Sequence, residues 1–231
     1  MPSAIDTRFR EWIHGLDPRG ARISIFQHIR DIPYSLHPPM TDPKTAPYQI
    51  LESGRGSCGP KHYLMAEMYR RLGLEVAFAT IPFVWNDPDI RYPPKLRELA
   101  SGLPVSYHLA CRVRIDSRWV LVDATWDRPL KRAGFPVNEF WDGRSDTLCA
   151  VKPLKSAVRT AFCHTVTNEP CRQGGGGGLN PLDGELDHMD REDRARYYRE
   201  KTGLRTPEEI HRIREFFEKF DRWLETLRQG A

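Results

Sequence analysis

The sequence predicts an α+β fold in which helices pack on an antiparallel sheet, with helices at both ends of the chain. Apolar residues recur at helical spacing in the first third of the 231-residue chain and again near its end. Between them lie three runs typical of strands, at 75–83, 106–115 and 118–126. The hydrophobic fraction of 39% and the charged fraction of 29% are ordinary for a soluble globular protein.

Two helices are expected at the N-terminal end. The segment 7–16 carries four apolar residues at helical spacing and ends near Pro18. The segment 19–31 repeats this pattern and stops before Pro33. The next segment, 34–48, contains four prolines, so we predict a surface loop there.

A glycine-rich turn leads into the next predicted helix. Residues 54–60 read GRGSCGP, and residues 61–72 carry an apolar stripe. Ser57 is a residue type favoured at the N-cap, and Pro60 is tolerated because first-turn amides have no intrahelical partner. Cys58 is therefore expected in the opening turn of this helix.

The predicted position of Cys58 suits a nucleophile. A helix N-terminus carries roughly half a positive charge, which stabilises a thiolate. A neighbouring imidazolium can bring the pKa of a thiol into the range of about 3.5–7.5. Glycines at positions 54, 56 and 59 leave room for a substrate to approach the sulfur. A glycine-rich turn around a buried, unreactive cysteine has the same sequence pattern, so further residues must decide between the two.

The predicted strands 106–115 and 118–126 give further evidence on whether Cys58 is catalytic. If Asp116 and Ser117 form a two-residue turn, one face of the resulting hairpin is almost wholly apolar and must face the core. His108 and Asp123 then lie on the opposite face as diagonal neighbours, with Cα atoms ~7–8 Å apart.

This juxtaposition has a chemical purpose. A carboxylate that accepts a hydrogen bond from one ring nitrogen fixes the tautomer of a histidine and leaves the other nitrogen to serve a thiol. A surface histidine and a surface acid are the ordinary interpretations of each residue alone. Together with the helix that carries the cysteine, they predict a catalytic triad of Cys58, His108 and Asp123.

These residues resemble the transglutaminase-like superfamily, which lies within the papain-like cysteine enzymes. The motifs are Gly56-Ser57-Cys58 at a helix start, His108 opening a strand, and Trp119 followed by Asp123-Ala124-Thr125. They occur in the family order, and the resemblance covers about residues 20–130.

The resemblance implies a papain/transglutaminase-like core, in which a central helix carries the nucleophile and an antiparallel sheet carries His108 and Asp123. It also implies acyl transfer on an amide bond of a protein or peptide. Cys58 would attack the carbonyl, His108 would move the proton, and the thioester would pass to water or to an amine. Hydrolysis is slightly favoured, since water is always present, and no cofactor is expected.

An oxyanion formed at this site needs hydrogen-bond donors. The backbone amide of Cys58 at the helix start would be one. Six residues earlier, where papain-type proteases have a glutamine, the chain has Glu52, which cannot donate when ionised. The second donor therefore stays open between Tyr34 and Gln49.

Other residues near these motifs have predicted roles outside the triad. Trp85 and Tyr92 lie on the long excursion 85–104 between two strands and are candidates for the rim of a substrate groove. His62 follows Cys58 by one helical turn and is expected on the helix surface.

The chain is predicted to divide into a catalytic domain (1–172), a glycine-rich linker (173–180) and a C-terminal helical extension (181–231). The linker contains five consecutive glycines, which have no preferred geometry. In the extension, Thr206-Pro207-Glu208-Glu209 opens a helix with an apolar stripe. This stripe is expected to pack on the catalytic domain or on a partner, a second copy of the chain included.

The charge distribution and the spacing of the cysteines exclude some classes of partner and site. The net charge of +4 is spread along the chain, so no nucleic-acid partner is expected. No apolar run has the length of a signal peptide or a membrane span, so we expect a cytoplasmic protein without a membrane partner. The five cysteines lack CxxC spacing and predict no metal site. The weakest option is a metal site of Cys163, His164, Cys171 and His188, whose spacings match no standard ligand set.

Two other functions remain possible from the sequence. An arylamine-acetyltransferase-like acyl carrier also joins a glycine-rich cysteine turn to a histidine and an aspartate. That family typically has an acid two residues after the cysteine, where this chain has Pro60. The second is a non-catalytic scaffold that keeps the fold and binds partners through its C-terminal helix.

Overall fold

The fold comes from a computed structural model, which describes residues 3–154, 203 and 205–230. The predicted linker at 173–180 lies outside these residues, as do the four side chains considered as metal ligands (Cys163, His164, Cys171 and His188). The predicted domain boundaries therefore stay predictions. Within the described part, no helix combines the length and apolar character needed to cross a membrane.

Four helices form the N-terminal part of the molecule: α1 (Ala4–Ile13), α2 (Pro18–Asp31), α3 (Ala46–Ser53) and α4 (Cys58–Arg71). α1 begins earlier than predicted, because Ser3 and Asp6 form a reciprocal capping box. α3 begins inside the predicted loop 34–48, and Pro47 lies in its first turn, where proline is tolerated. The loop prediction is therefore wrong for 46–48.

The strands β1 (Val76–Phe83), β2 (Ser106–Ile115) and β3 (Arg118–Val122) form an antiparallel sheet in the order β1-β2-β3. Ile115 pairs with Arg118, which is the predicted hairpin register. Asp116 and Ser117 form its turn with φ angles of 49° and 66°. Positive φ at both positions matches a two-residue turn to the twist of its strands. The predicted α+β class is confirmed.

The third strand is shorter than predicted. We expected it to reach Trp126, but its ladder with β2 ends four residues earlier. Beyond that point the backbone amides bind outside the sheet. The Asp123 amide donates to Thr147 Oγ1 at 2.9 Å, and the Ala124 amide donates to His62 Nε2 at 3.1 Å. The chain thus leaves the sheet at the residue that carries the predicted triad carboxylate.

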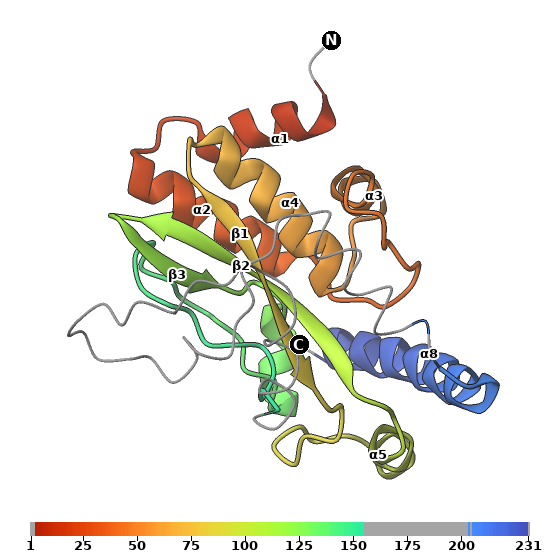
Figure 1. The fold of residues 1–231 in the computed structure, drawn as a ribbon. Coiled ribbons are helices and arrows are strands. Elements are labelled where there is room, and N and C mark those ends of the chain that lie inside the picture. Colours follow the sequence, from red (N-terminus) through yellow and green to blue (C-terminus); the bar gives the residue numbers. More distant parts are fainter. Residues whose placement is uncertain (1–2, 155–202, 204, 231) are drawn as a thin grey trace, which may run out of the picture.

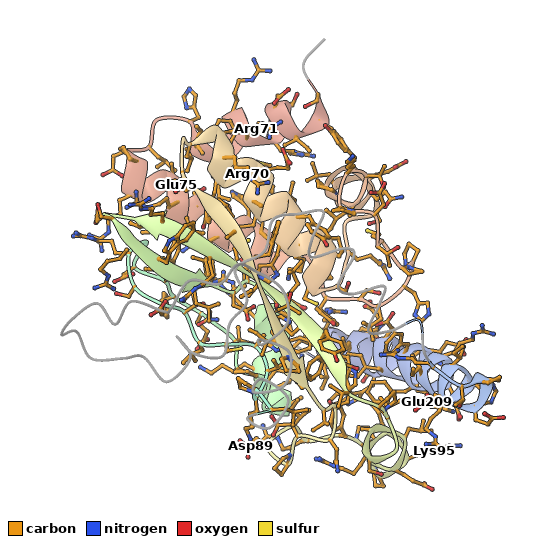
Figure 2. All side chains as sticks on the ribbon, in the orientation of Figure 1. Arg70, Arg71, Glu75, Asp89, Lys95 and Glu209 are labelled. Carbon is orange, nitrogen blue, oxygen red and sulfur yellow. The ribbon has the colours of Figure 1, made fainter. Side chains whose placement is uncertain are left out.

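α4 is the central helix of an apolar cluster that we call the first cluster. It packs on β1 and β2 and contacts α1, α2 and α3 (Figure 1). At its C-terminal end, where Figure 2 shows Arg70 and Arg71, Arg71 Nε donates to Asp6 Oδ1 of α1 at 2.9 Å. The first cluster includes Ile25, Phe26, Ile29, Ile50, Leu64, Met65, Met68, Phe78, Leu109, Val113, Val120 and Val122. α4 is therefore buried on most of its surface.

A second cluster, rich in aromatic side chains, includes residues of α5 (Pro94–Ser101), the 3-10 helix η1 (Arg128–Ala133) and α8 (Pro207–Gln229). α8 contacts both α5 and η1 and lies away from α1 in Figure 1. The second cluster includes Tyr34, Phe83, Trp85, Tyr92, Trp126, Phe135, Phe216, Phe220 and Leu224. The C-terminal helix therefore shares a core with residues of the predicted catalytic domain.

The two helices of the second cluster differ in how well the sequence predicts them. α8 begins at the predicted capping box, in which Thr206 Oγ1 accepts from the Glu209 amide at 3.2 Å. α5 lies in the excursion 85–104, for which we predicted no helix. It buries only Leu96 and Ala100, and a helix with so few buried positions has a weak apolar pattern.

Candidate active site

Cys58 is the first residue of α4, and a close-packed turn brings the chain to it. The Gly56 amide donates to Pro33 O at 3.1 Å, and a Cβ at Gly56 would lie 2.8 Å from Ile50 Cδ1. No larger residue fits there without displacing its neighbours. Ser57 is the N-cap, as predicted, but its side chain makes no capping hydrogen bond.

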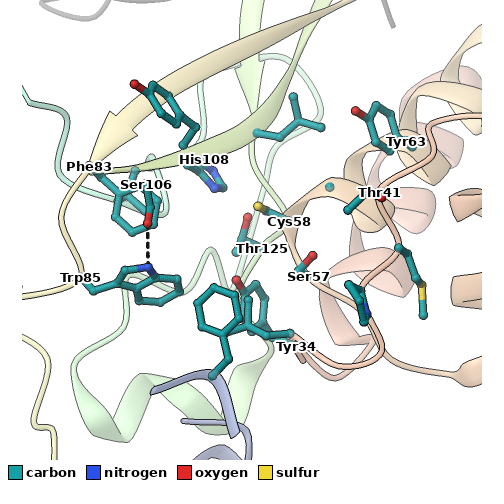
Figure 3. A pocket seen from close by; sticks show the side chains of 18 of the residues that line it. Tyr34, Thr41, Ser57, Cys58, Tyr63, Phe83, Trp85, Ser106, His108 and Thr125 are labelled. Carbon is teal, nitrogen blue, oxygen red and sulfur yellow. Dashed lines mark hydrogen bonds between the residues drawn. The ribbon is translucent and has the colours of Figure 1, made fainter. Parts of the chain in front are cut away.

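The side chains of His108 and Asp123 contact each other, in agreement with the predicted hairpin register. His108 Nε2 lies 2.8 Å from Asp123 Oδ2, and the two side chains are 2% and 0% exposed. The His108 side chain also shares a hydrogen bond with the Cys58 thiol. Because Nε2 is bound to the carboxylate, Nδ1 is the ring nitrogen available to the sulfur. In Figure 3, Cys58 and His108, which both line a cavity, point toward one another.

The Asp123 carboxylate is held by several donors. Oδ1 accepts from Thr125 Oγ1 at 2.6 Å and from the Thr125 amide at 3.2 Å. Oδ2 accepts from the Ala150 amide at 2.8 Å, in addition to the ring of His108. Burial alone would raise the pKa of Asp123, but the charge and hydrogen bond of His108 and the bond from Thr125 hold it well below its usual range. Asp123 is thus a fixed carboxylate at neutral pH.

The charge state of His108 follows from the same contacts. Burial alone would lower its pKa, because a buried imidazolium loses hydration. The charge and hydrogen bond of Asp123, followed by the hydrogen bond and charge of Cys58, raise the pKa well above its usual value. His108 is therefore protonated at neutral pH. An imidazolium beside a thiol at a helix N-terminus is the environment that produces a thiolate.

His62 is a residue whose role the sequence analysis missed. It was expected on the helix surface, but its side chain is buried completely, because helices and the sheet surround α4. His62 Nδ1 lies 2.8 Å from Cys58 O, and Nε2 accepts from the Ala124 amide at 3.1 Å. The ring is therefore neutral, with its proton on Nδ1 donated to the Cys58 carbonyl. It joins the first turn of α4 to the segment that carries Asp123.

The electrostatics of His62 agree with this geometry. Burial lowers its pKa to about 4, although Asp123 Oδ1, 3.6 Å from Nε2, acts in the opposite direction. A sequence signal did exist. The residues that follow His62 are Tyr63, Leu64, Met65 and Ala66, and such a run places apolar groups on every side of a helix.

Lys61 makes a second connection between α4 and the same segment. Its Nζ is buried and donates to Arg30 O at 3.0 Å, Ile32 O at 2.8 Å and Thr125 O at 2.7 Å. Three carbonyls thus match the three donors of an ammonium group. Together His62 and Lys61 fix the position of the helix start relative to residues 123–125.

A cavity of about 520 Å³ opens beside Cys58 and His108 (Figure 3). Tyr34 and Trp85, two of the predicted residues, line it. The indole nitrogen of Trp85 donates to Ser106 Oγ at 3.0 Å. The other lining residues include Leu36, Met40, Ser57, Tyr63, Phe83, Tyr107, Thr125, Trp126, Val151, Arg205 and Phe217.

Two predicted site residues lie elsewhere. Gln49 is exposed on α3 and does not line the cavity, so the structure does not bring it to Cys58. Tyr92 does not line the cavity either; it packs in the second cluster with ring centroids 5.3 Å from Trp223 and 6.2 Å from Phe220. Within the described residues its buried hydroxyl has no hydrogen-bond partner.

Comparisons with known proteins agree with the motifs. The model of the transglutaminase-like superfamily matches residues 13–124, a little under half of the chain, and this segment contains Cys58, His108 and Asp123. A search of curated proteins found no match.

Among solved structures, one described as a "putative cysteine protease" from Cytophaga hutchinsonii is similar, with a TM-score of 0.39 and 15% identity. The aligned part is 54% of this chain and 38% of that chain, so the similarity spans well under half of that protein. A TM-score this low supports no conclusion about function.

Proposed function

We propose, from the membership of residues 13–124 in the transglutaminase-like superfamily, that this chain is a cysteine-dependent acyl-transfer enzyme acting on amide bonds of proteins or peptides. One observation supports this most directly. The Cys58 thiol and the His108 ring share a hydrogen bond beside a cavity, and His108 is bound to a buried carboxylate. Cys58 is the nucleophile, His108 the acid and base, and Asp123 the group that orients His108.

The proposed acylation step uses these three residues. The Cys58 thiolate attacks the amide carbonyl and forms a C–S bond, while the carbonyl electrons move to the oxygen. His108 then donates its Nδ1 proton to the leaving nitrogen as the C–N bond breaks. The amine leaves, and a thioester remains on Cys58. Asp123 keeps the ring in the required tautomer throughout.

Deacylation returns the site to its starting state. A water molecule gives a proton to His108 Nδ1 as its oxygen attacks the thioester carbon, and breakage of the C–S bond regenerates the thiolate. An amine in place of water would give transamidation by the same steps. We favour hydrolysis, since water reaches any open cavity.

The developing oxyanion needs donors at the helix start. The backbone amide of Cys58 is the proposed first donor, since the N-terminal amides of a helix point along its axis. Tyr34 lines the cavity and remains the candidate for the second donor. Gln49 is withdrawn from this role because it lies away from the cavity.

The alternative of a non-catalytic scaffold explains the buried charges less well. A buried ion pair such as His108–Asp123 is weak evidence for stability, because desolvation offsets much of its attraction. Strongly shifted pKa values beside a cavity are instead typical of functional sites.

Mass spectrometry with reactive acyl substrates tests the proposal. The full chain is incubated with a panel of peptide and glutamine-amide electrophiles, and Cys58→Ala serves as the deficient variant. Cys149→Ala is the matched control, because Cys149 is another half-buried thiol and burial raises its pKa to about 12. We expect an adduct on the parent and on Cys149→Ala but none on Cys58→Ala. An adduct of equal yield on Cys58→Ala contradicts the proposal, as does a parent that alkylates no faster at pH 6 than an ordinary cysteine.

A further inference from the structure

We infer that the cavity beside Cys58 is a subsite for an uncharged aromatic group on the acyl side of the substrate, and that Phe217 of α8 determines this specificity. The inference rests on the proposed acyl transfer and adds the substrate class to it. Seven aromatic side chains line the cavity: Tyr34, Tyr63, Phe83, Trp85, Tyr107, Trp126 and Phe217.

The C-terminal helix supplies one wall of the cavity. On α8, Phe216 and Phe220 are buried completely in the second cluster, whereas Phe217 is only partly buried and faces the cavity. Its ring centroid lies 6.2 Å from that of Trp85. Phe217 lies outside the segment that matches the family model, so the family resemblance does not account for this wall.

α8 also fixes a second part of the cavity lining, which includes Tyr34 and Leu36. The Asp221 carboxylate accepts from the Leu36 amide at 2.9 Å and from the His37 amide at 3.0 Å. Arg228 donates to Tyr34 O at 2.8 Å. Phe217 and the segment that carries Tyr34 and Leu36 are therefore both positioned by one helix.

The size and chemistry of the walls favour an aromatic occupant. The volume of about 520 Å³ is within the ~300–1,000 Å³ that is usual for small-molecule sites. Aromatic rings attract one another in edge-to-face and offset arrangements beyond the effect of buried area. A site lined by seven aromatic side chains therefore binds a ring better than an aliphatic chain of similar size.

The charges around the cavity disfavour an ionic occupant. Aromatic walls also bind cations, but a cation site benefits from a carboxylate. Asp42 lines the cavity, yet its carboxylate already accepts from the Lys44 amide at 3.0 Å and from Thr45 Oγ1 at 3.0 Å. Arg205 lines the cavity with the opposite charge. The cavity thus offers an ion little net attraction.

Peptide aldehydes test the subsite on the full chain. The Cys58 thiolate attacks the aldehyde carbon, so that a C–S bond forms, the C=O π bond breaks and the oxygen takes the Nδ1 proton of His108. The probes are N-acetyl-phenylalaninal, N-acetyl-leucinal, N-acetyl-lysinal and N-acetyl-glycinal, and the readout is the ratio of their dissociation constants. We expect the phenylalanine probe to bind about 10- to 100-fold more tightly than the glycine probe, as for other apolar pockets.

Variants of α8 test the role of Phe217. Phe217→Ala is expected to reduce the preference for phenylalanine over glycine to less than about threefold. Phe217→Leu keeps apolar packing but lacks the ring, so it should lose the preference for phenylalanine over leucine even if the alanine variant folds poorly. Ile210→Ala is the matched control, because Ile210 is an exposed apolar residue of the same helix that does not line the cavity.

The outcomes separate the subsite from the proposed function. Equal binding of all four aldehydes, or a preference for the lysine probe, overturns the aromatic subsite and leaves acyl transfer intact. An unchanged preference in both Phe217 variants overturns the role of Phe217. Failure of every aldehyde and of iodoacetamide to react at Cys58 overturns the proposed function itself.

Discussion

The two apolar clusters of this molecule meet at Cys58 but are built differently. The first cluster surrounds α4 and is mostly aliphatic, and it holds His62 and Lys61 in fully hydrogen-bonded positions next to Cys58. The second cluster is rich in aromatic side chains and depends on α8, which lies far from Cys58 in the sequence. Cys58 packs against both clusters.

This difference in composition indicates that the two clusters have different roles. Buried polar groups with complete hydrogen bonding specify one arrangement of the chain, as a proposed catalytic triad requires. Aromatic walls instead offer contact area and shape to a ligand. Under the proposed function, changes beside the first cluster should alter the rate of reaction with any electrophile. Changes in the second cluster should alter selectivity and stability.

The largest effect is expected from Asp123→Asn. The amide cannot hold the His108 imidazolium by charge, and its NH₂ group favours the wrong ring tautomer. We expect the rate of Cys58 acylation at neutral pH to fall by a factor of ~10²–10⁴. Single-turnover kinetics with an ester substrate measure this fall. The pH profile of the acylation rate should shift as well.

Asp127→Asn is the matched control for this prediction. The Asp127 side chain is also buried, but it binds the Tyr34 amide and Arg228 and not His108. A fall in rate of the same size in both variants would show that loss of any nearby buried carboxylate is responsible. The Cys58–His108–Asp123 triad would then lose its support.

The first cluster could be predicted largely from local sequence patterns. The uniform apolar face of the hairpin fixed its register, and this placed His108 beside Asp123. The glycine-rich turn placed Cys58 at a helix start. These patterns have short range, since a strand or a helix turn shows its periodicity within a few residues.

The second cluster and the polar support of the site could not be predicted in this way. The burial of His62 depends on elements that surround α4 on all sides, and the position of α8 depends on contacts such as Arg228 with Asp127. Such contacts between distant residues leave no periodic pattern in the sequence. The same limit explains why Gln49 and Tyr92 were proposed for a site that neither lines.

A second prediction concerns the first cluster in acid. His62 has a pKa of about 4 in the fold, against an ordinary value of 6.5. Between these values the unfolded chain binds a proton that the folded chain does not, so stability falls as the pH drops through this window. The loss is ~3 kcal/mol in free energy of unfolding at most. Urea denaturation at pH 7 and pH 4.5 measures it.

Two other groups near His62 do not produce this slope, and Lys61, whose pKa burial lowers to about 7, reduces stability mainly as the pH falls from 10.5 to 7. The His108 contribution is complete below pH 6.5 and is lost only as the pH rises through its raised pKa. The Asp123 contribution is present above the ordinary carboxyl pKa of 3.8 and is lost only as the pH falls below it. His28 has a pKa lowered by burial, so His28→Gln is the matched control. We expect His62→Gln to remove more of the slope than His28→Gln, and the reverse order contradicts a neutral His62.

A third, smaller effect is expected in the second cluster. Arg228 donates to both oxygens of Asp127 and to Tyr34 O, and its side chain is only 13% exposed. Arg228→Ala should lower the free energy of unfolding by ~2 kcal/mol, because Asp127 loses its charged partner. It should also reduce the preference for the phenylalanine aldehyde, since the Tyr34 wall is released.

Arg55→Ala is the control for that change. Arg55 lies 3.7 Å from Glu225 of α8, and both side chains are about half exposed. An exposed pair of this kind contributes ~0.5 kcal/mol or less to stability. If Arg228→Ala and Arg55→Ala lower the free energy of unfolding equally, α8 is not held by its contacts with Asp127 and Tyr34.

The smallest expected effect lies outside both clusters, at the turn between β2 and β3. Ser117 has a φ of 66°, a left-handed conformation that costs a residue with a Cβ some free energy, whereas glycine adopts it readily. Ser117→Gly should therefore raise the free energy of unfolding by about 0.5–1 kcal/mol, and Ser117→Ala, which keeps the Cβ, should not. The turn is exposed and does not line the cavity, so aldehyde preference should stay unchanged while the melting temperature rises. A changed preference would mean that global stability, and not the two clusters around Cys58, controls what the site binds.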